Sequence, residues 1–447
     1  MNASSIWPRV PECAALFENL YREFAEANPL LLELETRFLE TAGVRIQNLI
    51  DHWIFPTDAN LQAEIERLGL VEITLPEGDR VWKHPSARLP ALRFKAKRTT
   101  PCLALIVEDV EAFATANNLT LDACHGDLNS TYQCAHLALS AGELMPIVRN
   151  GYSGYAPGTL SEEERVQMEA VQASLESRPR EGTEQAVIAE AIKRVEDAIA
   201  RIGIGRATDA FFLAERNYYT PRNRAATWQL AQQNSIGIGW ANQDHHTYRS
   251  SRASFQALIQ LFKTMGFIAR ERFYAGAEAG WGAQVLEHPI SRVVIFADVD
   301  VAPEELDIDF AATPLPERDT LGTIGLWCAL HTSSIAQAGM HHIECEYDYE
   351  KACSLLVANG HPVMSPFTDL PMLKQAFTVA EMWQVPFERL SPLVEKGLLA
   401  QTQADRFAQT GAAGSHLEIL QRWEGFKGFN KTGVSSIIRD TDARRQA

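Results

Sequence analysis

The sequence lacks the features that direct a chain to a membrane or to an oxidising compartment. No stretch contains the roughly 18 consecutive apolar residues that a membrane-spanning helix needs. The segment Met1–Pro11 has no basic region followed by an apolar run, the pattern of a secretory signal peptide. The seven cysteines are scattered singly and form no Cys-x-x-Cys pair, which argues against a disulfide scaffold and against a thiolate zinc site. We therefore expect a cytoplasmic protein that does not span a membrane.

Positive charge is also scarce. The chain has 41 lysines and arginines against 57 aspartates and glutamates, which gives a formal net charge of -16. This balance argues against non-specific binding of nucleic acid, which needs a basic surface. An acidic protein that binds an acidic substrate must concentrate positive charge locally, so individual arginines become candidate binding residues. With 447 residues, the chain is expected to form two domains around separate cores.

Two pairs of segments resemble each other across the chain. The segments at His52 and His245 each follow an aspartate and continue into an amphipathic helix that ends at a glycine, with extended segments after it. In a second pair, His136 and His342 each precede a predicted helix that ends in Asn-Gly. These patterns predict four βαβββ-like units, beginning near these four histidines.

Paired units of this kind predict an α+β fold of the vicinal oxygen chelate type. Its curved, half-open sheets can present ligands to one central metal. Between the halves, Ser161 and Glu164 form a capping-box pattern before a helical stretch. We therefore expect an N-terminal domain at residues 1–158, a helical insert at residues 159–235 and a metal-binding domain at residues 236–447.

The stretch Asp244–Arg249 contains the strongest candidate site residues. If it forms a strand, His245, Thr247 and Arg249 share one face because side chains alternate. An imidazole that can bind a metal then lies four residues along the same strand face from a guanidinium that can bind a carboxylate through two parallel hydrogen bonds. His246 would point to the opposite face and is the fallback ligand.

Further ligands are predicted downstream of this stretch. Either His341 or His342 can supply the second imidazole. For a carboxylate, Glu418 lies between apolar residues in the pattern of a late strand. Glu344 is its rival, because it shares a strand face with His342. Two ligands only two residues apart would leave the late strand without one, which favours Glu418.

The second half resembles the 2-oxoadipate dioxygenase/decarboxylase (hydroxyglutarate synthase) family, a branch of the vicinal oxygen chelate superfamily. His245 and Arg249 match the family's His-x-x-x-Arg motif before a helix that ends in Gly-aromatic. His342 matches a histidine that follows asparagine, although His341 occupies the asparagine position here. Glu418 matches the Glu of an apolar-Glu-apolar strand. The resemblance covers about residues 240–445 and favours His342 over His341.

This resemblance implies a non-haem Fe(II)-dependent dioxygenase/decarboxylase. Such an enzyme converts a 2-oxo dicarboxylic acid such as 2-oxoadipate, with O2, into a 2-hydroxy acid one carbon shorter and CO2. The small-molecule acid and O2 are then the partners, and Fe(II) is the cofactor. The implied site residues are the iron ligands His245, His342 and Glu418, the substrate-binding and catalytic Arg249, and the further substrate contacts Val434 and Ser435.

The N-terminal copy departs from the motif. Pro56 stands where the C-terminal copy has arginine, and no convincing third ligand follows His136. We therefore expect a degenerate copy that supports the fold. Two alternative functions remain open for the chain. It could be another metal-dependent enzyme of the superfamily (an extradiol-type dioxygenase, an isomerase or a lyase) or a non-catalytic small-molecule-binding protein of this fold. Separately, Arg249 could form a purely structural ion pair.

Overall fold

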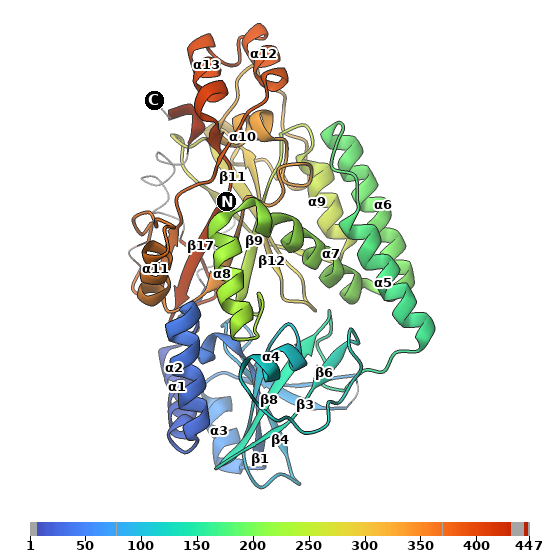
Figure 1. The fold of residues 1–447 in the computed structure, drawn as a ribbon, viewed down its shortest axis with the longest axis vertical. Helices are drawn as coiled ribbons and strands as arrows, with labels where there is room; N and C mark the ends of the chain where they lie inside the picture. The colour runs from blue at the N-terminus through green and yellow to red at the C-terminus, as the bar shows by residue number, and fades with distance from the viewer. Residues whose placement is uncertain (1–6, 77, 369, 431–441, 446–447) are drawn as a thin grey trace.

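Each half of the chain is built around one mixed β-sheet, so the predicted α+β fold is confirmed. In Figure 1 the N-terminal half, blue to teal, lies below the C-terminal half, and green helices run along one side of the upper sheet. None of the helices described is long and apolar enough to cross a membrane. The computed structural model describes residues 7–76, 78–368, 370–430 and 442–445.

The N-terminal sheet consists of two βαβββ units joined side by side. In chain order this half contains α1 (Pro11–Glu26), α2 (Pro29–Ala42), η1 (Ile46–Leu49), β1 (Ile50–Pro56), α3 (Ala59–Arg67), β2 (Val71–Thr74), β3 (Arg80–Lys83), β4 (Ala91–Lys95), β5 (Cys102–Ile106), α4 (Val110–Ala116), β6 (Tyr132–Cys134), β7 (Leu137–Leu139) and β8 (Gly142–Arg149). Within each unit the first strand pairs in parallel with the last, β1 with β4 and β5 with β8. The antiparallel pair of β1 and β5 joins the two units.

The second N-terminal unit begins at β5, so the prediction that it begins near His136 is wrong. The residues after His136 form the hairpin of β7 and β8, where a helix was predicted. Gly142 at the turn and Pro146 within β8 disfavour a helix there, because proline has no N–H to donate. The helix of this unit is α4, whose first turn is capped by the Asp109 carboxylate, which accepts a 2.7 Å hydrogen bond from the backbone N–H of Ala112.

The C-terminal sheet repeats the arrangement with larger insertions. In chain order this half contains β9 (Gln243–Arg249), α9 (Phe255–Thr264), β10 (Ile268–Tyr274), β11 (Trp281–Glu287), β12 (Val294–Asp300), η3 (Pro303–Glu305), α10 (Thr323–His331), β13 (His342–Glu346), α11 (Tyr349–Ala358), β14 (Leu373–Phe377), β15 (Met382–Trp383), α12 (Phe387–Glu395), α13 (Gln401–Thr410), β16 (Ala412–Ala413), β17 (His416–Arg422) and η4 (Ala443–Arg445). The parallel pairs are β9 with β12 and β13 with β17, and antiparallel β9 and β13 join the units.

The last unit is the least regular. Its second strand is reduced to an isolated bridge between Val363 and Thr378. Helices α12 and α13 are inserted between β14 and β17, and Figure 1 shows them at the far end of the molecule from the N-terminal sheet. Three of the four units begin with strands, β1, β9 and β13, that contain the histidines from which these units were predicted to begin.

Between the two sheets in chain order, the described residues form five helical elements, and one of them, α7 (Ile204–Tyr219), packs against the outer face of β9. The others are α5 (Glu162–Glu176), α6 (Glu184–Ile202), η2 (Thr220–Arg222) and α8 (Arg224–Ser235). The predicted capping box at the start of α5 is confirmed. On α7, the ring of Phe212 contacts Tyr248 of β9, and the buried Glu215 carboxylate lies 2.7 Å from Arg178. The division of the chain at residues 158 and 235 stays a prediction.

Candidate metal centre

The three proposed ligands lie on adjacent strands of the C-terminal sheet, β9, β13 and β17. Across β9 and β13, Thr247 is paired with His342 and His245 with Glu344. Across β13 and β17, Glu344 is paired with Glu418. Because paired residues on neighbouring strands point to the same face, these side chains converge on one side of the sheet. The strand face that the sequence predicted for His245 is therefore the face to which His342 and Glu418 also point.

The donor atoms of His245, His342 and Glu418 are close enough to share one ion. Glu418 Oε2 lies 3.0 Å from His342 Nε2 and 3.5 Å from His245 Nε2. All three residues are buried, and one donor atom from each falls within 4.8 Å of the others. Ligand atoms bound at about 2.1 Å to one metal lie about 3.0–3.5 Å apart. The structure thus assembles two imidazoles and one carboxylate in a geometry suited to a metal ion.

Glu344 contacts the opposite edge of the His245 ring. Its Oε1 lies 2.7 Å from His245 Nδ1, and Asp244 Oδ2 lies 3.6 Å from the same nitrogen. Asp244, His245 and Glu344 also bring one donor atom each to within 4.8 Å of the others. However, a carboxylate on the second nitrogen of a ligand histidine is a common way to orient that ring. The geometry therefore favours Glu418 as the ligand and Glu344 as the residue that orients His245.

Gln375 of β14 connects the two glutamates. Its side-chain amide donates to Glu344 Oε2 at 2.7 Å and to Glu418 Oε1 at 3.1 Å. These hydrogen bonds fix both carboxylates and leave Glu418 Oε2 directed at the histidines. The sequence analysis missed Gln375, because no local pattern marks a glutamine that acts through its pairing with a distant strand.

The other candidate histidines have different places. His246 lies on the opposite face of β9 against the ring of Phe212, and neither of its ring nitrogens has a hydrogen-bond partner among the residues described. His341 borders the cavity, and its Nδ1 lies 2.9 Å from Nδ1 of His342. His416 also lines this cavity. The two additional imidazoles thus form a wall beside His342.

The charges at the centre fit a cation. Burial, and then the Glu418 carboxylate, raise the pKa of Glu344 well above its usual value. Burial alone would lower the pKa of His245, but Glu344 and the other acidic neighbours hold it well above the ordinary value. A metal ion requires neutral imidazoles and ionised carboxylates, and it replaces the proton that these crowded groups otherwise share. Two imidazoles and one carboxylate would leave coordination positions open on a bound metal ion.

A cavity of about 90 Å³ adjoins the candidate ligands. Arg249 lines it, and its guanidinium lies 5.3 Å from the centre of the Trp327 ring. Arg249 Nε has no hydrogen-bond partner among the described residues, and its distance to Asp298 Oδ2 is 3.8 Å. Burial raises the pKa of Asp298 to about 7 despite the nearby guanidinium. The two substrate contacts proposed at Val434 and Ser435 lie outside the described residues.

The strand register also gives the counterpart of each proposed ligand in the N-terminal sheet. His52 is the counterpart of His245, Cys102 is the counterpart of His342, and Met145 is the counterpart of Glu418. His52 is fully buried, and its Nδ1 lies 2.7 Å from Asp51. A thioether and a buried thiol do not replace an imidazole and a carboxylate as iron ligands. Pro56 occupies the position of the cavity arginine, so this face does not reproduce the C-terminal centre.

The N-terminal half nevertheless contacts β9, the strand that contains His245, through Arg88. Its guanidinium forms an ion pair with Asp244, the neighbour of His245, and its Nε lies 2.7 Å from Glu346. Arg422 of β17 also reaches Asp244, at 2.7 Å. The carboxylate beside the candidate ligand is therefore held by one arginine from each half of the chain.

Replacing Arg88 with methionine is expected to weaken metal binding about tenfold, the lower end of the range for residues that orient ligands. The substitution keeps the length of the side chain but leaves Asp244 with one arginine partner fewer. Metal titration followed by anaerobic dialysis measures the change. Arg80→Met, which removes an exposed ion pair with Glu72 in the same half, is the matched control. Equal affinities for the two variants would contradict the role of Arg88.

No family model and no curated protein matches the sequence. A 4-hydroxymandelate synthase from Streptomyces coelicolor has a similar structure, with 10% identity and a TM-score of 0.27 over 89% of this chain and 98% of that chain. A xylose isomerase-like TIM barrel/4-hydroxyphenylpyruvate dioxygenase fusion protein has 11% identity and a TM-score of 0.24, over 90% of this chain and 53% of that chain. A methylmalonyl-CoA epimerase from Mycobacterium tuberculosis has 11% identity and a TM-score of 0.24, over 41% of this chain and 88% of that chain. These similarities are too low to equate individual residues.

Proposed function

We propose that the protein is a non-haem Fe(II)-dependent dioxygenase/decarboxylase that acts on a 2-oxo dicarboxylic acid such as 2-oxoadipate. The observation that carries the proposal is the convergence of His245, His342 and Glu418 at the wall of a cavity that also contains Arg249. Such a donor set leaves positions open on the ion for substrate and O2. Bound there, iron would supply the redox chemistry that activates O2 and a Lewis acid for the 2-oxo acid.

The proposed reaction balances without a second organic substrate. The bond between C1 and C2 of the 2-oxo acid breaks, and C1 leaves as CO2. One atom of O2 enters the new carboxylate, and the other forms the hydroxyl group on the adjacent carbon. Because the substrate carries its own 2-oxo acid group, no separate 2-oxoglutarate is needed.

Arg249 is proposed to bind a carboxylate of this substrate. A guanidinium binds a carboxylate through two parallel hydrogen bonds, which fixes the direction of the bound acid as well as its position. Among the described residues, the buried Arg249 forms an ion pair with Asp298 alone, and this pair is weak because the 3.8 Å separation is long and the Asp298 pKa of about 7 leaves that carboxyl partly protonated near neutral pH. An anionic substrate would add a stronger charge partner.

The aromatic walls of the cavity suit the carbon chain of such an acid. Phe296, Phe377 and Phe429 line the space beside the candidate ligands. The Phe296 ring centre lies 4.4 Å from that of His245. These rings exclude water from the donor atoms and contact methylene groups, while the arginine selects the charged end.

The test combines O2 uptake with CO2 release. Protein loaded anaerobically with Fe(II) is expected to consume O2 and release CO2 in equal amounts with at least one member of a panel of 2-oxo acids. His245→Ala should lose bound iron and turnover, whereas His361→Ala, in a loop away from the cavity, should retain both. The assignment fails if the His245 variant matches the parent in metal content and turnover.

The same measurements separate the alternative functions. Turnover without O2 uptake would indicate an isomerase or lyase of the same superfamily. O2 uptake without CO2 release would indicate an extradiol-type dioxygenase. Absence of stoichiometric iron in folded, anaerobically loaded protein would indicate a binding protein.

A further inference from the structure

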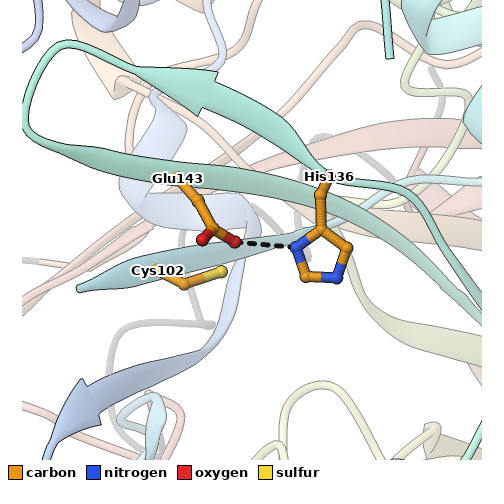
Figure 2. A group of neighbouring side chains, drawn as sticks. All are labelled: Cys102, His136 and Glu143. Atoms are coloured by element: carbon orange, nitrogen blue, oxygen red, sulfur yellow. Dashed lines mark hydrogen bonds and ion pairs between the residues drawn. The ribbon is translucent and has the colours of Figure 1, made fainter. Parts of the chain in front are cut away.

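A second group of potential metal ligands lies in the N-terminal sheet, apart from the centre described above. It contains Cys102 on β5, His136 between β6 and β7, and Glu143 on β8 (Figure 2). One donor atom from each residue lies within 4.8 Å of the others, and His136 Nδ1 is 2.8 Å from Glu143 Oε2. Figure 2 shows the sulfur of Cys102 directed toward the space beside this hydrogen-bonded pair.

Backbone pairing holds the three residues together. Cys102 is paired with Glu143 across the parallel strands β5 and β8. The hairpin of β7 and β8 folds back so that Ala138 is paired with Glu143, which brings the nearby His136 to the same place. Since β5, β6 and β7 are all paired with β8, the sheet holds Cys102 and Glu143 and both ends of the short connection that contains His136.

This group is displaced from the position of the C-terminal centre. Cys102 is the counterpart of His342, but the counterpart of Glu418 is Met145. Glu143 instead corresponds to His416 on the C-terminal sheet. The N-terminal sheet therefore offers a carboxylate two residues earlier on β8, on the same face, with an imidazole from the β6–β7 connection beside it.

Burial and charge distinguish this group from an ordinary surface ion pair. Burial raises the pKa of the Cys102 thiol to about 12, so the free thiol stays protonated and unreactive. Glu143 is ionised, because the ion pair with Arg98 and the hydrogen bond with His136 outweigh the effect of burial and lower its pKa. The side chains of His136 and Glu143 are 27% and 32% exposed, which gives a cation and its water ligands access to the buried sulfur.

Arg98 does not block the proposed ion. Its Nη2 lies 2.6 Å from Glu143 Oε2, the same oxygen that His136 approaches. With the thiol ionised, the thiolate and the carboxylate carry two negative charges and Arg98 carries one positive charge. A divalent cation is therefore compatible with the charge of the group, and ionisation of a thiol on metal binding is ordinary zinc chemistry.

We propose that Cys102, His136 and Glu143 bind one Zn²⁺ or a similar borderline-soft divalent cation, with water completing the coordination. A thiolate and an imidazole select such ions over Mg²⁺ and Ca²⁺, which prefer oxygen ligands. The site is independent of the proposed dioxygenase activity, because it shares no residue with the C-terminal centre.

Cobalt provides a spectroscopic test that the C-terminal centre cannot imitate. Co²⁺ bound by a thiolate gives an intense near-ultraviolet charge-transfer band, and the C-terminal candidate ligands include no cysteine. Reduced protein carrying His342→Ala is titrated with Co²⁺, so that the C-terminal centre is disabled. We expect about one equivalent of Co²⁺ to bind with this band, and Zn²⁺ to displace it. Adding Cys102→Ser should abolish the band.

Matched variants make the ligand assignment falsifiable. Cys134→Ser alters another buried cysteine of the same apolar cluster and should keep the band. His136→Gln, at a partly exposed position, should weaken Co²⁺ binding at least tenfold, and it replaces Cys102→Ser as the test if circular dichroism shows that the latter does not fold. No band in the folded His342→Ala protein, or a band that survives loss of Cys102, overturns the proposal.

Discussion

Replacing Glu418 with glutamine is expected to abolish stoichiometric iron binding and to lower turnover by about 1000-fold or more, beyond the 10–100-fold typical of residues that only orient a ligand. Glutamine keeps the shape of the side chain but removes the anionic donor. The affected atom, Oε2, lies 3.0 Å from His342 Nε2 and 3.5 Å from His245 Nε2, so the loss falls where the three donors meet. Iron content after anaerobic loading and O2 uptake measure the two effects.

Glu344→Gln is the matched control, because it makes the same change one strand away. Glu344 contacts Nδ1 of His245 and receives a hydrogen bond from Gln375. Its substitution should weaken metal affinity by about 10–100-fold and leave measurable turnover at saturating iron. Retention of iron by Glu418→Gln, together with its loss from Glu344→Gln, would show that Glu344 is the ligand and that the order inferred from the geometry is wrong.

The sequence could predict which candidate residues share a strand face, because that signal is local and periodic. Alternation along a strand placed His245 and Arg249 on one face, and the structure has both in the cavity wall. The choice between His245 and His246 followed from the same alternation, and the structure places His246 on the opposite face against Phe212. Strand order then brings the distant His342 and Glu418 to the same place, as the repeat of βαβββ units implied.

What the sequence could not predict depends on contacts between distant segments. Gln375 and Arg88 act through partners on other strands or in the other half of the chain, and neither lies in a recognisable local pattern. The unit assigned to His136 was wrong because an apolar stretch can be either a helix or a hairpin until its pairing is known. The absence of Cys-x-x-Cys spacing argued against a thiolate site, but a sheet can bring Cys102 to other ligands without that spacing.

Replacing Arg249 with lysine is expected to lower kcat/KM for a 2-oxo dicarboxylic acid about 100-fold, which corresponds to about 2.7 kcal/mol, with iron content unchanged. Lysine keeps the positive charge but cannot form two parallel hydrogen bonds to a carboxylate. Steady-state kinetics at saturating iron measure the change. Arg252→Lys is the matched control, since Arg252 follows β9 closely but pairs with Glu305 outside the cavity.

The substrate dependence of this variant identifies which carboxylate Arg249 binds. If the guanidinium binds the carboxylate remote from the 2-oxo group, Arg249→Lys should impair dicarboxylic 2-oxo acids far more than monocarboxylic ones of the same length. An equal loss for both classes would place Arg249 on the carboxylate that all these acids share. Loss of iron from the variant would instead indicate that Arg249, 3.8 Å from Asp298, maintains the structure of β9 and β12. Unchanged kinetics with every acid would remove Arg249 from the binding site, because a buried guanidinium that contacts substrate cannot be shortened to an ammonium without cost.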